Sequence, residues 1–314
     1  MMRDIYILSC AEDGGIYRYG FQNGELIFKD KTPLDRPMYA IKRDNKMLVI
    51  LRETESENHF GGFLSFDIAE DGSLVNKSDI VSTKGIVPCH LEADGDVYVV
   101  NYLSGNIVKL PEKVVTHSGK GVHPTRQTAP HTHFVCLSPD KNRILCTDLG
   151  LDTIFLYDRD LTEKFSVKVP EGSGARHLCF SKCGKYLYCV NELSNDISVF
   201  EYNDGNPKIL GTYKALPDYT GQSTAAAIRI KDEYLYISNR GADTISRFKI
   251  DGEKLILLEN TDCGGVGPRD FEIIDNHIIC TNEQSDSVTV LNLVDGKPLL
   301  TNSKIEIKAP LCVL

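Results

Sequence analysis

Several stretches of the chain repeat one pattern: a short β-branched and aromatic run, an Asn, a small polar turn and a second alternating run. This pattern predicts two antiparallel strands joined by a tight turn. Clear copies begin at Val97, Tyr186, Tyr234 and Ile278, and a copy with Asp in the Asn position begins at Ile144. Looser copies begin at Ile5 and near Leu48.

Upstream of each hairpin lies one more short strand, opened by proline or a small residue. These openings are 42 to 51 residues apart, which is the length that four short strands and their turns need in a propeller blade. The openings are Pro37, Pro88, Pro130, Ala175, Ala225, Pro268 and Pro310. Seven openings predict an all-β fold: one seven-bladed β-propeller of four-stranded antiparallel blades, forming a single domain over residues 1–314.

The two ends of the chain complement each other. After Pro310 only one strand's worth of residues follows, and the chain begins at what would be the second strand of a blade, from Ile5 to Cys10. We therefore expect the C-terminal strand to complete the N-terminal blade, so that no sheet edge stays open. The alternative is an array of β-sandwiches or two smaller barrels. Lys113 to Thr128 is expected to form a long loop within one blade.

Composition restricts the possible partners. The chain has 35 basic and 44 acidic residues, a net charge of −9 without blocks of like charge, which argues against nucleic-acid or anionic membrane surfaces. A small cationic pocket is still compatible with this balance. Ten cysteines occur without a C-x-x-C pair, and about half lie in apolar strand-like runs. With no signal-like or membrane-spanning apolar segment, we expect a reduced, cytoplasmic protein that is a monomer.

Blade geometry predicts where the chemistry lies. The first strand of a blade starts, and the second strand ends, on the same face and near the axis, so these positions from different blades meet at one mouth of the channel. In some blades these positions carry apolar residues without a reactive group, namely Met38, Ala226 and Leu311. The strand-one starts also offer His90, His131, His133, Arg176, His177, Arg269 and Asp270, and the strand-two ends offer Tyr102, Asp148, Glu192, Arg240 and Glu283. Loops at one end of a rigid scaffold are the usual location of active sites.

From about Pro88 to the C-terminus the chain resembles the seven-bladed propeller lactonases, which include one type of bacterial 6-phosphogluconolactonase and the fungal carboxy-muconate lactonizing enzyme. The motifs are Pro130-His-Thr-His with Ser138-Pro-Asp, Gly174-Ala-Arg-His, Tyr188-Cys-Val-Asn-Glu, Ser238-Asn-Arg and Gly267-Pro-Arg. The resemblance implies His131 or His133, Arg176, Glu192 and Arg240 as site residues. The departures are turn changes, such as Ala175 for a usual proline and Lys141 for a glycine.

Lactone hydrolysis needs a base to activate water, donors for the oxyanion and, for an anionic substrate, a cationic clamp. Arginine suits the clamp because its planar fork binds phosphate or carboxylate in a bidentate manner. We assign Arg176 and Arg240, with Arg269 as a third member, to anion and oxyanion binding. Glu192 is the candidate general base, assisted by His131 or His133. The plainer interpretation makes Glu192 an ion-pair partner of Arg176.

The other polar residues are interpreted structurally. Glu283 is expected to pair with Arg240 or Arg269, and His177 to point away from the channel and form a hydrogen bond within its blade. His131 and His133 have a spacing that suits a metal, but a third ligand is missing, so we expect neither metal nor cofactor. His117, His123 and His59 look like loop residues.

Three functions remain open from the sequence. The leading one is hydrolysis of a sugar lactone, with 6-phosphogluconolactone as the first candidate, so the partner would be a small lactone or anionic sugar. The second is a lactonizing isomerase that closes an unsaturated dicarboxylate, using the same arginines. The third is a propeller without catalysis that binds a protein, because fold alone does not fix function.

Overall fold

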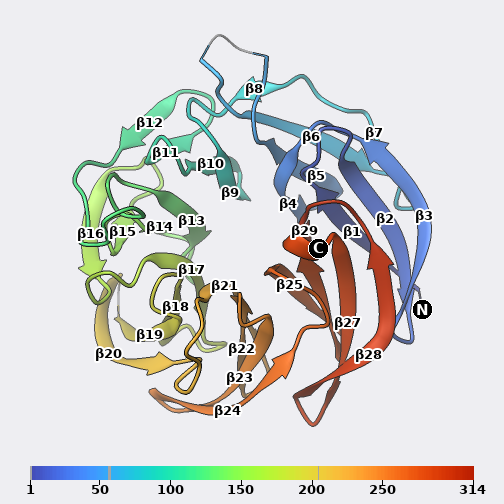
Figure 1. Ribbon diagram of the computed structural model, residues 1–314. Coiled ribbons are helices and arrows are strands. Elements are labelled where there is room, and N and C mark those ends of the chain that lie inside the picture. Colours follow the sequence, from blue (N-terminus) through green and yellow to red (C-terminus); the bar gives the residue numbers. More distant parts are fainter. Residues whose placement is uncertain (1, 56–57, 204) are drawn as a thin grey trace.

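The blades surround one axis, as expected. The computed structural model describes residues 2–55, 58–203 and 205–314, and these form seven antiparallel sheets arranged in a ring (Figure 1). Each sheet places its first strand next to the axis and its last strand at the rim. The predicted seven-bladed propeller is confirmed.

Blades 1 to 4 follow one another along the chain, except that blade 1 also contains the C-terminal strand. Blade 1 contains β29 (Pro310–Val313), β1 (Arg3–Ser9), β2 (Gly15–Gln22) and β3 (Glu25–Pro33). Blade 2 contains β4 (Pro37–Arg43), β5 (Lys46–Leu51), β6 (Gly62–Ile68), β7 (Leu74–Val75) and β8 (Val81–Ser82). Blade 3 contains β9 (Pro88–Asp94), β10 (Asp96–Asn101), β11 (Asn106–Lys109) and β12 (Lys113–Thr116). Blade 4 contains β13 (Thr132–Leu137), β14 (Ile144–Asp148), β15 (Thr153–Tyr157) and β16 (Glu163–Lys168).

The remaining three blades follow the same order. Blade 5 contains β17 (Ala175–Phe180), β18 (Tyr186–Asn191), β19 (Asp196–Asn203) and β20 (Asn206–Lys214). Blade 6 contains β21 (Thr224–Lys231), β22 (Tyr234–Arg240), β23 (Thr244–Asp251) and β24 (Lys254–Asp262). Blade 7 contains β25 (Pro268–Ile274), β26 (His277–Asn282), a short 3-10 helix η1 (Glu283–Ser285), β27 (Ser287–Val294) and β28 (Lys297–Glu306).

The ring closes through the chain termini. β29 pairs with β1, and Ile7 is opposite Val313 in this register. The C-terminal strand therefore supplies the innermost strand of blade 1, as Figure 1 shows where the last and first segments meet. In blade 2 the outer strand is split, because the two-residue strands β7 and β8 both pair with β6. This split explains why the sequence repeat is weak there.

The core lies between blades rather than within one layer. Seven clusters of buried apolar side chains each join two neighbouring blades. For example, Val190 and Val199 of blade 5 pack with Ile228 and Ile237 of blade 6. Alternating apolar residues on both faces of each sheet produce this arrangement, because each blade is covered by a neighbour on both sides.

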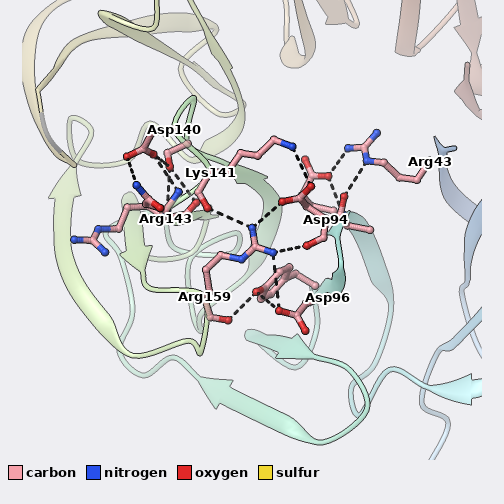
Figure 2. A network of polar contacts seen from close by, with 12 residues as sticks. Arg43, Asp94, Asp96, Asp140, Lys141, Arg143 and Arg159 are labelled. Atoms are coloured by element: carbon pink, nitrogen blue, oxygen red, sulfur yellow. Dashed lines mark hydrogen bonds and ion pairs between the residues drawn. The ribbon is translucent and has the colours of Figure 1, made fainter.

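The face opposite the predicted site carries a network of charged side chains that links blades 2, 3 and 4 (Figure 2). Arg159 donates to the Asp94 carboxylate at 3.1 Å and to the main-chain oxygen of Lys141 at 3.3 Å. The Lys141 ammonium donates to Asp94 at 3.0 Å. Arg43 of β4 donates to the main-chain oxygen of Ala93 at 2.9 Å. This network joins the ends of adjacent blades.

Candidate functional site

A bulge at the start of each innermost strand shapes the channel. In each of the seven blades the pairing between the first two strands shifts near this point, so that at least one extra residue faces the axis. The extra residues are Leu311, Met38, Cys89, His133, Arg176, Ala226 and Arg269. Bulges of this kind re-aim side chains next to functional sites. The polar members come from blades 4, 5 and 7.

The repeated asparagine has a structural role at the end of the second strand. The Asn191 amide donates to the Asp196 carboxylate at 2.7 Å and to the Ser198 hydroxyl at 2.9 Å. Asn239 donates to Ser246 at 2.7 Å in the same way. These bonds hold the tight turn, so that the next residue along the chain projects at the channel mouth. In blade 5 that residue is Glu192.

Glu192 lies at the centre of three arginines. Its Oε2 accepts a hydrogen bond from Arg176 Nε at 2.9 Å and forms an ion pair with Arg240 Nη2 at 2.9 Å, and its Oε1 accepts a hydrogen bond from Arg126 Nη2 at 2.5 Å. Only 2% of Glu192 and 2% of Arg176 are exposed. Arg176 also donates to the main-chain oxygen of Ala226 at 2.7 Å, which fixes its orientation. The structure thus brings the predicted Arg176, Glu192 and Arg240 together.

The charges in this cluster are unequal, since three guanidinium groups share one carboxylate. Burial alone raises the pKa of Glu192, but Arg240, Arg176, His133 and Arg126 outweigh it and hold the pKa well below 4.5. Burial, with repulsion from Arg240, lowers the pKa of Arg176 to about 9, so it stays protonated at neutral pH. At neutral pH this group therefore carries two more positive charges than negative ones.

Arg126 was missed by the sequence analysis. It lies on the segment 117–131 between β12 and β13, which we call the strap, and its guanidinium also donates to the Tyr102 hydroxyl at 3.3 Å. The repeat does not cover the strap, so blade register gave no signal for it. The only hint was the excess of His, Gly and Lys from Lys113 to Thr128, a stretch that was expected to be a loop but whose first residues form β12.

A groove of about 1020 Å³ opens beside the arginine cluster, between blades 5 and 6. Arg126 and Arg240 face it at the inner end, and Lys214 lines it at the outer strand of blade 5. Its size is at the upper end of the range for small-molecule sites, and cations at its inner end suit an anionic ligand. The charge cluster is therefore accessible to a ligand from this groove.

Arg269 lies next to the cluster but has a different partner. It forms an ion pair with Glu283 at 3.2 Å, one of the two partners expected for that glutamate. Together with Arg176 and His133 it lines a small axial cavity of about 20 Å³, room for about one water molecule. Arg269 therefore borders the axial cavity, whereas Arg240 lines the groove.

The direction predicted for His177 is wrong, although it does form a hydrogen bond within its blade. It was expected to point away from the channel, but it lines the axial cavity, and its Nε2 accepts a hydrogen bond from Arg176 Nη1 at 3.0 Å. The bulge at Arg176 interrupts the alternation of the strand, so that Arg176 and His177 both reach the axis. Burial first, and then Arg176, hold the pKa of His177 well below 6.5.

The two histidines of the Pro-His-x-His motif differ in environment. His131 lies just before β13, stacks on the Tyr102 ring at 4.4 Å, and its Nδ1 is 3.1 Å from the Tyr102 main-chain oxygen. Since a carbonyl oxygen only accepts, Nδ1 of a neutral His131 carries the proton and Nε2 is the basic atom. His133 is the bulge residue, and its buried Nδ1 has no hydrogen-bond partner within the described residues.

Asp148 does not belong to the mouth. It occupies the position of the repeated asparagine, and its carboxylate accepts the main-chain N–H of His131 at 2.8 Å and of Leu151 at 3.1 Å. Its other oxygen is 2.7 Å from Nδ1 of His117, which is buried rather than a free loop residue. The mouth position in blade 4 is one residue later, at Leu149.

Among the described residues, no three His, Cys, Asp or Glu side chains lie close enough together to bind a metal ion. All ten cysteines are free thiols. The search for helices long and apolar enough to cross a membrane, limited to the described residues, found none.

Comparison with known proteins shows the family to which the chain belongs. Residues 4–314 match the family described as "Lactonase, 7-bladed beta-propeller". An uncharacterised protein of Staphylococcus epidermidis is 30% identical over 96% of this chain and 95% of its own length, and one of Staphylococcus aureus is equally similar. The chain belongs to the seven-bladed β-propeller lactonase family.

Solved structures agree with this assignment. A protein from Lactobacillus plantarum is 26% identical, covers 100% of this chain and 99% of its own, and has a TM-score of 0.90. A Bacteroides fragilis protein, provisionally described as a 6-phosphogluconolactonase, is 26% identical over 99% of this chain and 97% of its own, with a TM-score of 0.88. The periplasmic gluconolactonase of Pseudomonas aeruginosa shares the fold, at 23% identity over 100% of this chain and 99% of its own, with a TM-score of 0.89.

Proposed function

We propose that this protein hydrolyses a sugar lactone that carries an anionic group, with 6-phosphogluconolactone as the leading substrate, at the channel mouth. The observation that carries this proposal is the buried cluster in which Arg126, Arg176 and Arg240 share one carboxylate, because its excess positive charge suits a dianion such as a phosphate monoester. Membership of the lactonase family and the name given to the Bacteroides fragilis protein support the same choice.

The roles follow from the contacts. Arg176 and Arg240 present N–H donors beside Glu192 and would hold the lactone carbonyl oxygen as it gains negative charge. Arg269, which lines the axial cavity, would contribute a further cation. Glu192 is proposed as the general base that takes a proton from the attacking water. His131, with a basic Nε2, or His133, in the axial cavity, would assist in proton transfer.

A lactonizing isomerase that acts on a dicarboxylate is the second candidate, since the same excess of positive charge would suit two carboxylates. We also expect a monomer in a reducing compartment, for which the ten free thiols are the supporting observation.

The experiment is a lactone-hydrolysis assay at neutral pH without added metal. The wild-type protein is expected to accelerate hydrolysis of 6-phosphogluconolactone, and Arg176→Ala or Glu192→Gln to lower the rate by about 100-fold or more. Both variants are first checked to be folded at the assay temperature. Unchanged turnover in both variants would reject the site. Loss of muconate absorbance, with no lactone hydrolysis, would favour the isomerase instead.

A further inference from the structure

Hydrogen bonds of the Gln127 side chain and of the Arg126 main-chain N–H hold the strap in place at Arg126. Gln127 is fully buried, and its amide donates to the main-chain oxygen of Leu149 at 2.8 Å and to the Asp152 carboxylate at 2.7 Å. His123 Nδ1 accepts the main-chain N–H of Arg126 at 3.2 Å. The backbone beneath Arg126 is therefore anchored, and its guanidinium reaches the mouth from outside the blades.

The three arginines around Glu192 are not equivalent. The side chain of Arg126 is 38% exposed, against 14% for Arg240 and 3% for Arg176. Arg176 and Arg240 both bind Oε2, whereas Oε1 is held by Arg126. Arg126 also faces the groove through which a ligand would arrive. Arg126 can therefore leave Glu192 and bind an incoming anion, while the ion pairs of Glu192 with Arg176 and Arg240 stay in place.

This arrangement answers a difficulty with Glu192 as a base. A carboxylate that forms ion pairs with three guanidinium groups is fully ionised and holds protons poorly. Charged and titratable groups surround it from several elements: Arg126 on the strap, Arg176 on β17, Arg240 on β22, His133 on β13 and Arg269 on β25. Removal of one arginine from this set raises the proton affinity of the carboxylate.

We propose that Arg126 binds the anionic group of the substrate and, by leaving Glu192, frees Oε1 to accept a proton from the attacking water. The proposal rests on the lactonase function above. The water oxygen forms a bond to the carbonyl carbon, its proton passes to Oε1, and the carbonyl electron pair moves to the oxygen held by Arg176 and Arg240. The ring C–O bond then breaks, and the ring oxygen takes the proton from Glu192. A lactone without an anionic group would leave Glu192 paired and react slowly.

The kinetic test compares Arg126→Ala and Arg126→Lys with wild type on 6-phosphogluconolactone and on glucono-1,5-lactone. In Arg126→Ala we expect kcat/KM for the phosphorylated lactone to fall about 10- to 100-fold. For the unphosphorylated lactone we expect it to stay level or rise, since Glu192 is already free. Arg126→Lys should recover part of the preference. Lys120→Ala removes an exposed cation from the same strap and serves as the matched control.

The second readout does not depend on turnover. With 13C-labelled glutamate, the Glu192 carboxyl signal is assigned by its loss in Glu192→Gln and then titrated with acid. Saturating 6-phosphogluconate is expected to raise the apparent pKa of Glu192 by about 1–3 units in wild type. In Arg126→Ala it should be raised before the ligand is added, with little further change.

The outcomes separate this inference from the proposed function. If wild type hydrolyses neither lactone, the proposed function fails. The inference itself is overturned if Arg126→Ala slows both lactones equally, if the Glu192 titration is the same with and without 6-phosphogluconate, or if 6-phosphogluconate does not bind.

Discussion

The channel mouth and the opposite face both contain arginines and carboxylates, yet they use them differently. At the mouth, Arg126, Arg176 and Arg240 converge on Glu192, which is buried. On the opposite face the contacts are balanced and solvated: Asp94 accepts from both Lys141 and Arg159, and Arg159 also approaches Asp96 at 3.9 Å (Figure 2). The residue types are the same in both regions.

The difference shows how a ligand site can be separated from a structural ion-pair network. Exposed pairs that balance one another contribute little free energy and need no further partner. A buried cluster with surplus charge is costly unless something of opposite charge completes it. Charge balance and burial, rather than the presence of arginine, are therefore the grounds on which we propose the mouth as the ligand-binding region.

The largest expected effect on stability comes from removing the shared carboxylate. Glu192→Gln leaves three guanidinium groups, including the buried one of Arg176, without their counter-charge, so the free energy of unfolding should fall by about 3–5 kcal/mol. Urea unfolding at pH 7.5 measures this, and added inorganic phosphate should restore part of the loss. Asp94→Asn on the opposite face is the control and should barely move the unfolding midpoint. Equal losses in the two variants would erase the contrast between the regions.

The second effect, of similar size, is the pH dependence of the free energy of unfolding, which differs between the two regions. Burial, with nearby arginines, holds the pKa of His90, His133 and His177 well below 6.5, so below pH 6.5 these rings stay neutral in the folded protein but are charged in the unfolded chain. Their contribution to stability is fully present above pH 6.5 and is lost as pH falls below it. The expected slope is about 4 kcal/mol per pH unit for the three rings together.

The opposite face responds in a lower pH window. Hydrogen bonds from Lys141 and Arg159 lower the pKa of Asp94 below 3.8, so its contribution is lost only in more acidic solution. Urea unfolding from pH 7.5 to 4.5 checks this difference. His133→Asn should reduce the slope by about a third, and His59→Asn, at an exposed position, should not. A flat profile between pH 7 and 5 would contradict the description of the channel.

The smallest expected effect on stability comes from removing an arginine from the ion-pair network of the opposite face. Arg159→Ala should lower the free energy of unfolding by at most about 1 kcal/mol, because its side chain is partly solvated. The loss should shrink further in about 0.5 M NaCl, where exposed charges are screened. Lactone hydrolysis by this variant should equal that of wild type. A larger, salt-insensitive loss would show that the network is more than a surface contact.

The repeat made most of the fold predictable. The openings at Pro37 and Pro88, among others, begin innermost strands, and the strand after Pro310 closes blade 1 as expected. The split outer strand of blade 2 was not foreseen, because the two short strands β7 and β8 carry no alternating pattern of useful length.

The site was predictable only where it follows the repeat. Arg176 lies at the start of a first strand, and Glu192 and Arg240 lie at the ends of second strands, so the blade register predicted that they meet at one mouth. Arg126 belongs to the strap, whose path depends on contacts such as that of Gln127 with Leu149, and these cannot be derived from periodicity. His177 was misplaced because a bulge adds a residue without any sequence signature.

The central claim is that the surplus positive charge around Glu192 serves lactone hydrolysis, and one assay tests it most directly. Hydrolysis of 6-phosphogluconolactone is followed, after subtraction of the spontaneous rate, for wild type, Arg176→Ala and Arg159→Ala side by side. We predict fast hydrolysis by wild type and Arg159→Ala and a rate about 100-fold lower for Arg176→Ala. A wild-type rate no faster than buffer, or an Arg176→Ala rate equal to wild type, would contradict the account.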